Sequence, residues 1–264
     1  MKLSNFIAVV VAILFATTTL HAATSGQGTA KITRIKGSAR YTTGGNSWQT
    51  LREGDVLNPG ATIQTASEST VDIVLGSNNE VVAPQPIVRK FTYGSAPDAT
   101  QNIIRLRENT VLAIDRLWQE QTGADTVSET QLDLRAGRVF GNVKKLSAAS
   151  KFEVKLPNGV AGIRGTLFDL TANSLTVFFG AVVISYFDGT GTLVTKVVIA
   201  GEQLDFNTGI IKPIPAGDQK DGKHQGDRLE GPGAPSPTYI TLNPSRQVVL
   251  SKTENDQGDN NNNQ

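Results

Sequence analysis

The chain has 264 residues, with 25 Lys and Arg against 24 Asp and Glu, two histidines and no cysteine. This near-zero balance lacks the basic excess of a protein that binds nucleic acid or anionic lipid. Without cysteine the chain forms no disulfide bond, thiolate metal site or cysteine nucleophile, so its stability depends on buried apolar side chains and hydrogen-bonded sheet. Because only His224 lies beyond the first 23 residues, neither a His-dependent triad nor a zinc site is expected.

The first residues predict an exported precursor. Lys2 supplies a positive charge, and Phe6–Phe15 supplies about ten apolar residues, which is typical of a signal peptide and shorter than the roughly 20 of a membrane-spanning helix. Small residues follow, so we expect a signal peptide over residues 1–23 with cleavage after Ala22 or Ala23; an uncleaved anchor helix is the alternative. The mature form then has no membrane span and lies in the periplasm or on the outer surface of a bacterium.

The rest of the chain shows the pattern of short strands. Runs of β-branched residues alternate with polar ones, as in Val71, Ile73 and Leu75, and Gly, Asn, Asp or Pro interrupts them every eight to twelve residues. This predicts an all-β fold in a single domain of short strands, either wound as a β-solenoid or packed as a compact sandwich. Asp115–Thr122 is the one segment where a short helix is expected.

Two segments break the strand pattern. Residues 83–102 contain three prolines and no sustained period, which predicts an inserted surface loop. After residue 214 Gly, Asp, Lys and Pro dominate, and the chain ends in an Asn-rich run. We therefore expect the β domain to occupy residues 29–214 and residues 215–264 to form a disordered tail, with a candidate edge strand at residues 239–250.

Two stretches resemble the FecR family. Residues 51–81 (LREGDVLNPGATIQTASESTVDIVLGSNNEV) follow its pattern of a Leu and Gly, a small turn, a Thr and an alternating strand. Residues 132–146 (LDLRAGRVFGNVKKL) and 152–170 (FEVKLPNGVAGIRGTLFDL) resemble its strand pair and its most specific motif, Phe-x-Val, Pro, then Arg-Gly-Thr-x-Phe. The positions that carry the motif are Phe152, Val154, Pro157, Arg164, Gly165, Thr166 and Phe168.

The resemblance implies a periplasmic β domain that binds other envelope components, either a protein or a polysaccharide. The best-known family members also carry a cytoplasmic anti-sigma segment and a membrane helix, and their periplasmic part senses an outer-membrane transporter. Here the apolar stretch begins a few residues from Met1, so we expect no cytoplasmic segment and do not carry over the anti-sigma role.

Arg164, Gly165 and Thr166 are the candidate site residues. Gly165 can adopt backbone angles closed to other residues, and the Arg164 guanidinium suits a carboxylate or carbonyl groups. Its role is either a contact with a partner or an internal staple that joins one turn of sheet to the next. The staple, with Arg164 paired with a carboxylate such as Asp169 or Glu153, is the preferred interpretation. Phe168 is expected in the core.

Two other sets of residues were weighed as sites. An exported β scaffold could place two carboxylates across a glycosidic bond, but no spacing singles out a pair among Asp55, Asp72, Glu80, Glu108, Asp115, Glu129 and Asp133. Four aromatic residues could form a platform for sugar rings: Trp48, Trp118, Tyr41 and Tyr93. A core position is favoured for Trp48, and both interpretations stay open for Trp118.

The sequence therefore predicts an exported, non-enzymatic envelope protein without a cofactor, which acts as a structural module or as an interaction module for a protein or polysaccharide. The alternatives are a carbohydrate-active hydrolase with paired carboxylates and a diverged component of cell-surface signalling.

Overall fold

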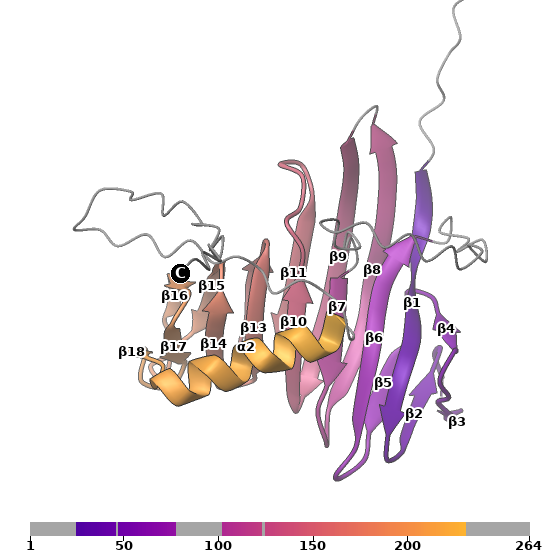
Figure 1. The fold of residues 1–264 in the computed structure, drawn as a ribbon, viewed down its shortest axis with the longest axis horizontal. Helices are drawn as coiled ribbons and strands as arrows, with labels where there is room; N and C mark the ends of the chain where they lie inside the picture. Colours follow the sequence, from indigo (N-terminus) through magenta and orange to yellow (C-terminus); the bar gives the residue numbers. More distant parts are fainter. Residues whose placement is uncertain (1–24, 46, 78–101, 123–124, 231–264) are drawn as a thin grey trace, which may run out of the picture. The chain divides into compact units, whose positions relative to one another are not determined.

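The computed structural model describes residues 25–45, 47–77, 102–122 and 125–230. The expected signal peptide, almost all of the expected insertion at residues 83–102 and the candidate edge strand at residues 239–250 lie outside these ranges. Within them the chain forms strands β1 to β18 and helix α2 (Figure 1). The prediction of an all-β fold is confirmed.

The strands form two sheets. In sheet A the order across the sheet is β3 (Gln49–Thr50), β2 (Ala39–Thr42), β5 (Thr62–Thr65), β8 (Val111–Thr122), β9 (Asp125–Ala136), β11 (Lys151–Leu156), β12 (Gly159–Ile163), β15 (Ala181–Phe187) and β16 (Leu193–Ile199). In sheet B it is β4 (Val56–Leu57), β1 (Ser25–Lys36), β6 (Thr70–Ser77), β7 (Asn102–Leu106), β10 (Arg138–Val143), β13 (Thr166–Thr171), β14 (Ser174–Phe179), β17 (Glu202–Asp205) and β18 (Ile211–Pro213). The first residues of β1 also pair with β8, so β1 joins the two sheets.

Successive strand pairs alternate between the sheets. Strands β11 and β12 lie in sheet A, β13 and β14 in sheet B, β15 and β16 in sheet A, and β17 and β18 in sheet B. The chain thus winds from one sheet to the other as a solenoid does, while the sheets pack together as in a sandwich. Both expected architectures describe part of the fold.

Alternating side chains of both sheets form one core. Phe152 and Val154 of β11 and Phe168 of β13 belong to the same buried apolar cluster as Leu175 of β14 and Ile184 of β15. Phe168 is fully buried, as predicted. A methyl group on Gly141 of β10 would lie only 2.4 Å from Phe168 Cζ, so the glycine leaves room for the ring.

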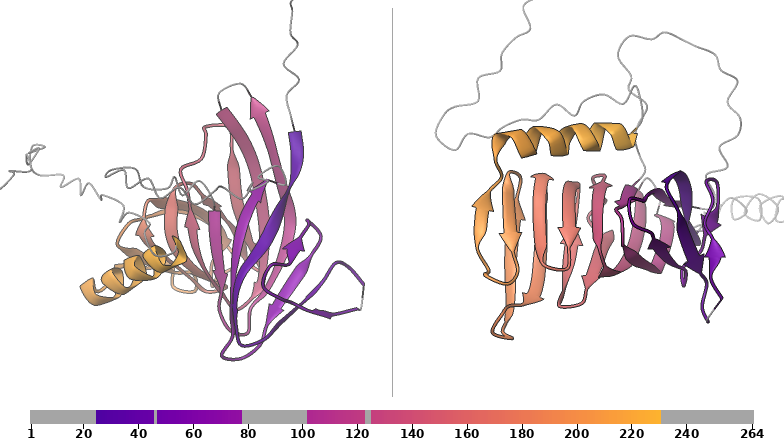
Figure 2. Two further views of the ribbon diagram at one scale, coloured as in Figure 1. Left: turned by 45° about the vertical axis from the view of Figure 1, so that its right-hand side comes forward. Right: turned by 90° about the horizontal axis from the view of Figure 1, so that it is seen from below.

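Helix α2 (Ala216–Glu230) adds a third layer on the outer face of sheet B, where it crosses several strands (Figures 1 and 2). A second apolar cluster fills this layer and comprises Phe140, Leu167, Phe178, Ile214 and Leu229. This part of the expected tail was therefore predicted wrongly. The segment has few apolar residues, so its sequence pattern did not indicate a helix. Gly222 and Gly226 let the helix backbone approach Phe178 and Leu167 closely.

The helix expected at Asp115–Thr122 is also absent, because this segment is part of strand β8 and pairs with β9 along its length. The pairing register shifts between Ile114 and Arg116. Both Asp115 and Arg116 are exposed, whereas Ile114 and Leu117 are buried. At this bulge the buried residues are three positions apart instead of two, and this spacing resembles a helical pattern in the sequence.

The outer face of sheet B contains two buried carboxylates, each bound by an arginine on a neighbouring strand. Arg105 Nε and Nη2 donate to Asp72 at 2.6 and 2.8 Å, and Arg138 Nε and Nη2 donate to Asp169 at 2.6 and 2.7 Å. These hydrogen bonds raise the pKa of both guanidinium groups above the ordinary value. Paired in this way, Asp72 and Asp169 can be buried in the sheet face beside α2.

Arg107, which follows β7, joins this face to the helix. Its Nη2 donates to Gln225 Oε1 of α2, and its Cζ lies 6.0 Å from the Phe140 ring centroid. Burial lowers the pKa of the Arg107 guanidinium. A polar contact therefore holds the helix in addition to the apolar cluster.

Candidate interaction surface

A group of exposed apolar side chains covers the outer face of sheet A at β12, β15 and β16. We call this group the apolar surface; its members are Val160, Val183, Phe187, Leu193, Val197 and Ile199. Val183 lies opposite Val197, and Phe187 lies opposite Leu193, across the β15–β16 ladder. Contiguous exposed apolar surface of this kind usually marks an interaction site.

Alternation along β15 and β16 produces this surface. Val182, Ile184 and Val198 point into the core, so their neighbours in sequence point outward. The remaining outward positions are Ala181, Ser185 and Thr195, and the hydroxyls of Ser185 and Thr195 are 2.8 Å apart and hydrogen-bonded. The outward side chains of both strands are therefore uncharged.

Strand β16 is the edge of sheet A. Among the described residues it pairs with β15 alone. Near its end, the Ile199 N–H donates to Glu202 Oε2 at 3.0 Å. Lys196 lies on the inward side of the strand, where its Nζ donates to the Gly209 carbonyl. An edge strand of seven residues whose outward face is apolar can accept a further strand.

The predicted site residues Arg164, Gly165 and Thr166 lie where the chain crosses from β12 in sheet A to β13 in sheet B. Gly165 has a φ of 65°, a conformation that favours glycine. Buried Thr166 donates its hydroxyl to the Ala181 carbonyl at 2.9 Å. Gly165 therefore lets the chain turn at this crossover, and Thr166 binds it to the next one, from β14 to β15.

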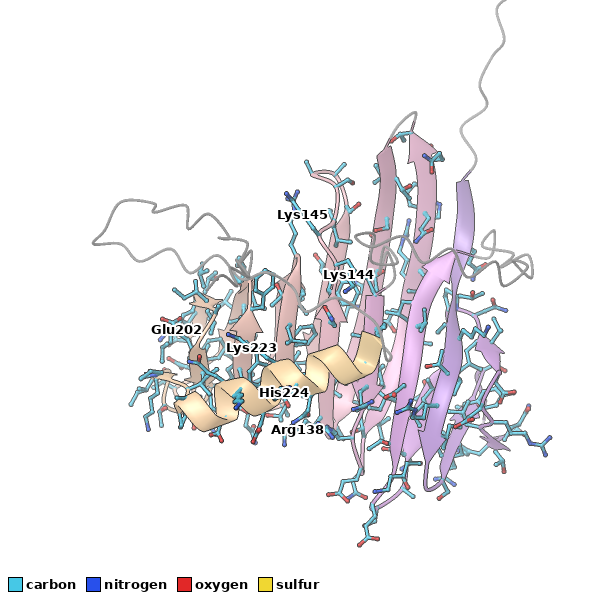
Figure 3. The ribbon with its side chains drawn as sticks, in the orientation of Figure 1. Arg138, Lys144, Lys145, Glu202, Lys223 and His224 are labelled. Carbon is cyan, nitrogen blue, oxygen red and sulfur yellow. The ribbon has the colours of Figure 1, made fainter. Side chains whose placement is uncertain are left out.

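Arg164 is exposed, and its Nη2 donates to the Leu146 carbonyl at 3.3 Å, in the crossover from β10 to β11. The expected pairing of Arg164 with Asp169 or Glu153 is wrong, because Asp169 binds Arg138 and Glu153 accepts from Gln131 Nε2. Arg138, the residue that binds Asp169, lies toward one end of β10, and the Lys144–Lys145 pair lies toward the other end (Figure 3). A partner contact through Arg164 stays a prediction.

The carboxylates considered for glycoside hydrolysis have separate partners. Asp115 binds Lys155, Glu129 binds Arg116 and Asp133 binds Arg135. Asp55 accepts from the Arg52 N–H and Glu108 from the Glu68 N–H. Asp72 is bound by Arg105, and Glu80 lies outside the described residues.

The aromatic candidates do not form one platform. Trp48 is 39% exposed and lies against the Arg40 guanidinium, with Arg40 Cζ 4.5 Å from the ring centroid, so the expectation of a core position is wrong. Tyr41 donates to Gln49 Oε1 at 3.0 Å. Trp118 lies on β8, partly buried, and Tyr93 is outside the described residues.

No metal site or membrane helix was found in the part of the chain that the structure describes. His, Cys, Asp and Glu side chains there form no group of three or more that could hold a metal ion. His224 is exposed on α2 (Figure 3). Within the same ranges no helix is long and apolar enough to cross a membrane.

Comparison with known proteins gives a family match for the strands around the crossovers. Residues 96–183 match the family described as FecR protein. This range includes the Arg-Gly-Thr crossover and begins inside the segment expected as an insertion. Two crystal structures of a candidate anti-sigma factor from Parabacteroides distasonis align with a TM-score of 0.33 and 16% identity, over 45% of this chain and 54% of that chain. A search of curated proteins found no match. Residues 96–183 are therefore the part of this chain that is similar to the FecR family.

Proposed function

We propose that the protein is an exported, non-catalytic interaction module of the bacterial envelope, and that its apolar surface binds an extended, uncharged segment of an envelope protein. The observation that carries the proposal is the apolar surface beside the free edge of β16. FecR-domain proteins act in envelope signalling, which favours a protein partner. Export rests on the signal-peptide pattern of residues 1–23.

The chemistry of the surface favours a strand of protein over a polysaccharide. Its outward positions contain no charged side chain, and only Ser185 and Thr195 are polar. A sugar chain would leave its hydroxyl groups against apolar side chains without hydrogen-bond partners. An added strand instead satisfies its main-chain groups along the edge and lays alternate apolar side chains beside Leu193, Val197 and Ile199, the outward apolar residues of β16.

Crosslinking in cells followed by purification tests the proposal. We compare the wild-type protein with Val197→Lys and with Val56→Lys, because Val197 and Val56 are similarly exposed, at 55% and 54%, on different sheets. A partner recovered with the wild type and Val56→Lys but lost with Val197→Lys supports the apolar surface as the contact. Equal recovery with all three proteins would contradict it.

The mass of the purified protein in solution tests a competing occupant. If the protein is a dimer that Val197→Lys dissociates and Val56→Lys does not, the apolar surface binds a second copy of the chain. That outcome would overturn the assignment to another protein. A monomer at all concentrations is the expected result.

A further inference from the structure

A cavity of about 440 Å³ lies over β2, β3 and β5, at the other end of sheet A from the apolar surface. Its lining comprises Ser38, Ala39, Arg40, Thr50, Gln64, Thr65, Ala66 and Asn109. This volume is within the range of small-ligand sites. Most of the lining side chains offer hydroxyl, amide or guanidinium groups, whereas its apolar members are alanines.

Arg40 is held in place at the centre of a cross-strand row. It lies opposite Thr50 on β3 and opposite Gln64 on β5. Its Nε donates to Gln64 Oε1 at 2.8 Å, and the Trp48 ring lies against the guanidinium, 4.5 Å from Cζ. These two contacts fix the plane of the guanidinium and leave the N–H groups of both Nη atoms for another acceptor.

Arg40 also differs in its charge environment from the arginines that form ion pairs. Arg105, Arg116, Arg135 and Arg138 each form an ion pair, but within the described ranges no carboxylate lies within ion-pair distance of Arg40. A planar guanidinium with a free pair of Nη groups is suited to bidentate binding of a carboxylate. The cavity thus contains an oriented positive charge that lacks its own counter-ion.

We propose that this cavity binds an acidic sugar unit of a polysaccharide, with its carboxylate on Arg40. The side chains of Ser38, Thr50, Gln64 and Asn109 offer donors and acceptors for ring hydroxyls. Trp48 does not line the cavity, but it lies against Arg40 and is 39% exposed, so it offers an aromatic face for the sugar ring. A peptide carboxylate would find no apolar pocket for its side chains here. The site is separate from the apolar surface and does not depend on it.

Trp48 fluorescence can report binding directly. The chain has two tryptophans, so a Trp118→Phe background leaves Trp48 as the sole tryptophan emitter. We titrate this protein with trigalacturonic acid and with its neutral methyl ester, at low salt. The expected result is a saturable change in emission with the acid, and at least about tenfold weaker binding of the ester, because the ester cannot form a charge-assisted hydrogen-bond pair.

Variants in the same background assign the effect to Arg40. Arg40→Gln is expected to weaken binding of the acid at least about tenfold, and Arg40→Lys, which keeps the charge but loses the fork, by less. Arg135→Gln is the matched control, because Arg135 is an exposed arginine of sheet A that is paired with Asp133 outside the cavity. It should bind as tightly as the parent protein. Circular dichroism establishes that each variant is folded.

Several outcomes would overturn the proposal. The first is no saturable change in emission with trigalacturonic acid up to 10 mM, about the weakest affinity expected for such a site. The others are an ester that binds as tightly as the acid, and an Arg40→Gln protein that binds the acid as tightly as the parent protein. If N-acetyl-aspartyl-glycine binds as tightly as trigalacturonic acid and with the same dependence on Arg40, the site recognises carboxylates in peptides and the assignment to a sugar is wrong.

Discussion

The outer faces of sheets A and B differ in what lies over them. On sheet B, helix α2 covers Phe178 and Leu167, and the neighbouring strands bury Asp72 and Asp169 against arginines. On sheet A, no described element covers the apolar surface, although Val183 and Val197 are as apolar as the residues beneath the helix. The same alternating strands therefore give one face that α2 covers and one that no described element covers, where we propose that a partner binds.

The Arg105–Asp72 pair of sheet B and the Arg135–Asp133 pair of sheet A differ in the same way. Arg105 and Asp72 on sheet B have side chains that are only 13% and 9% exposed. Arg135 on sheet A is 54% exposed in its pair with Asp133. An exposed pair contributes little to stability, whereas loss of one partner of a buried pair leaves a charge without compensation.

Arg105→Ala is expected to have the largest effect. It leaves the buried Asp72 carboxylate unpaired and should lower the free energy of unfolding by about 3–5 kcal/mol in urea denaturation. Arg135→Ala, the control on sheet A, should change it by about 1 kcal/mol or less. The double variant Arg105→Ala/Asp72→Ala should regain part of the free energy of unfolding that Arg105→Ala loses. Equal effects of the two single changes would show that the two faces do not differ in this respect.

Substitution of two glycines of α2 tests the contact of this helix with sheet B. A methyl group on Gly222 would lie 2.1 Å from Phe178 Cε1, so Gly222→Ala should destabilise the protein by about 1–3 kcal/mol. Gly217 has open space, and Gly217→Ala should stabilise the same helix by up to about 1 kcal/mol. Thermal unfolding measures both changes. Stabilisation by both would mean that α2 does not lie against Phe178 in solution.

Much of the fold could be predicted because strand alternation is a local property of the sequence. Phe152, Val154 and Leu156 alternate with polar residues and are buried as expected. The prediction failed where a tertiary contact decides the structure. The bulge beside Arg116 depends on pairing with β9, and α2 depends on the fit of Gly222 against Phe178, which lies 44 residues away (222 − 178).

The candidate sites were harder to predict for the same reason. Arg164 was singled out by its motif, but the sequence could not show that Asp169 is bound by Arg138 instead. The apolar surface gave no local signal, because outward and inward residues of β16 are equally apolar: Val197 is exposed and its neighbour Val198 is buried. Only the pairing of β16 with β15 and the position of the core distinguish these two valines.

Val197 and Val198 provide the finest test, and the smallest expected effect. Threonine has nearly the shape of valine but adds a hydroxyl. Val198→Thr buries that hydroxyl in the core and should cost about 1–3 kcal/mol in urea denaturation. Val197→Thr places it on the apolar surface and should change the free energy of unfolding by less than about 0.5 kcal/mol. If both changes cost the same, the surface is covered in the purified protein. A cost that falls on dilution would then identify a second copy as the cover, since only self-association depends on protein concentration.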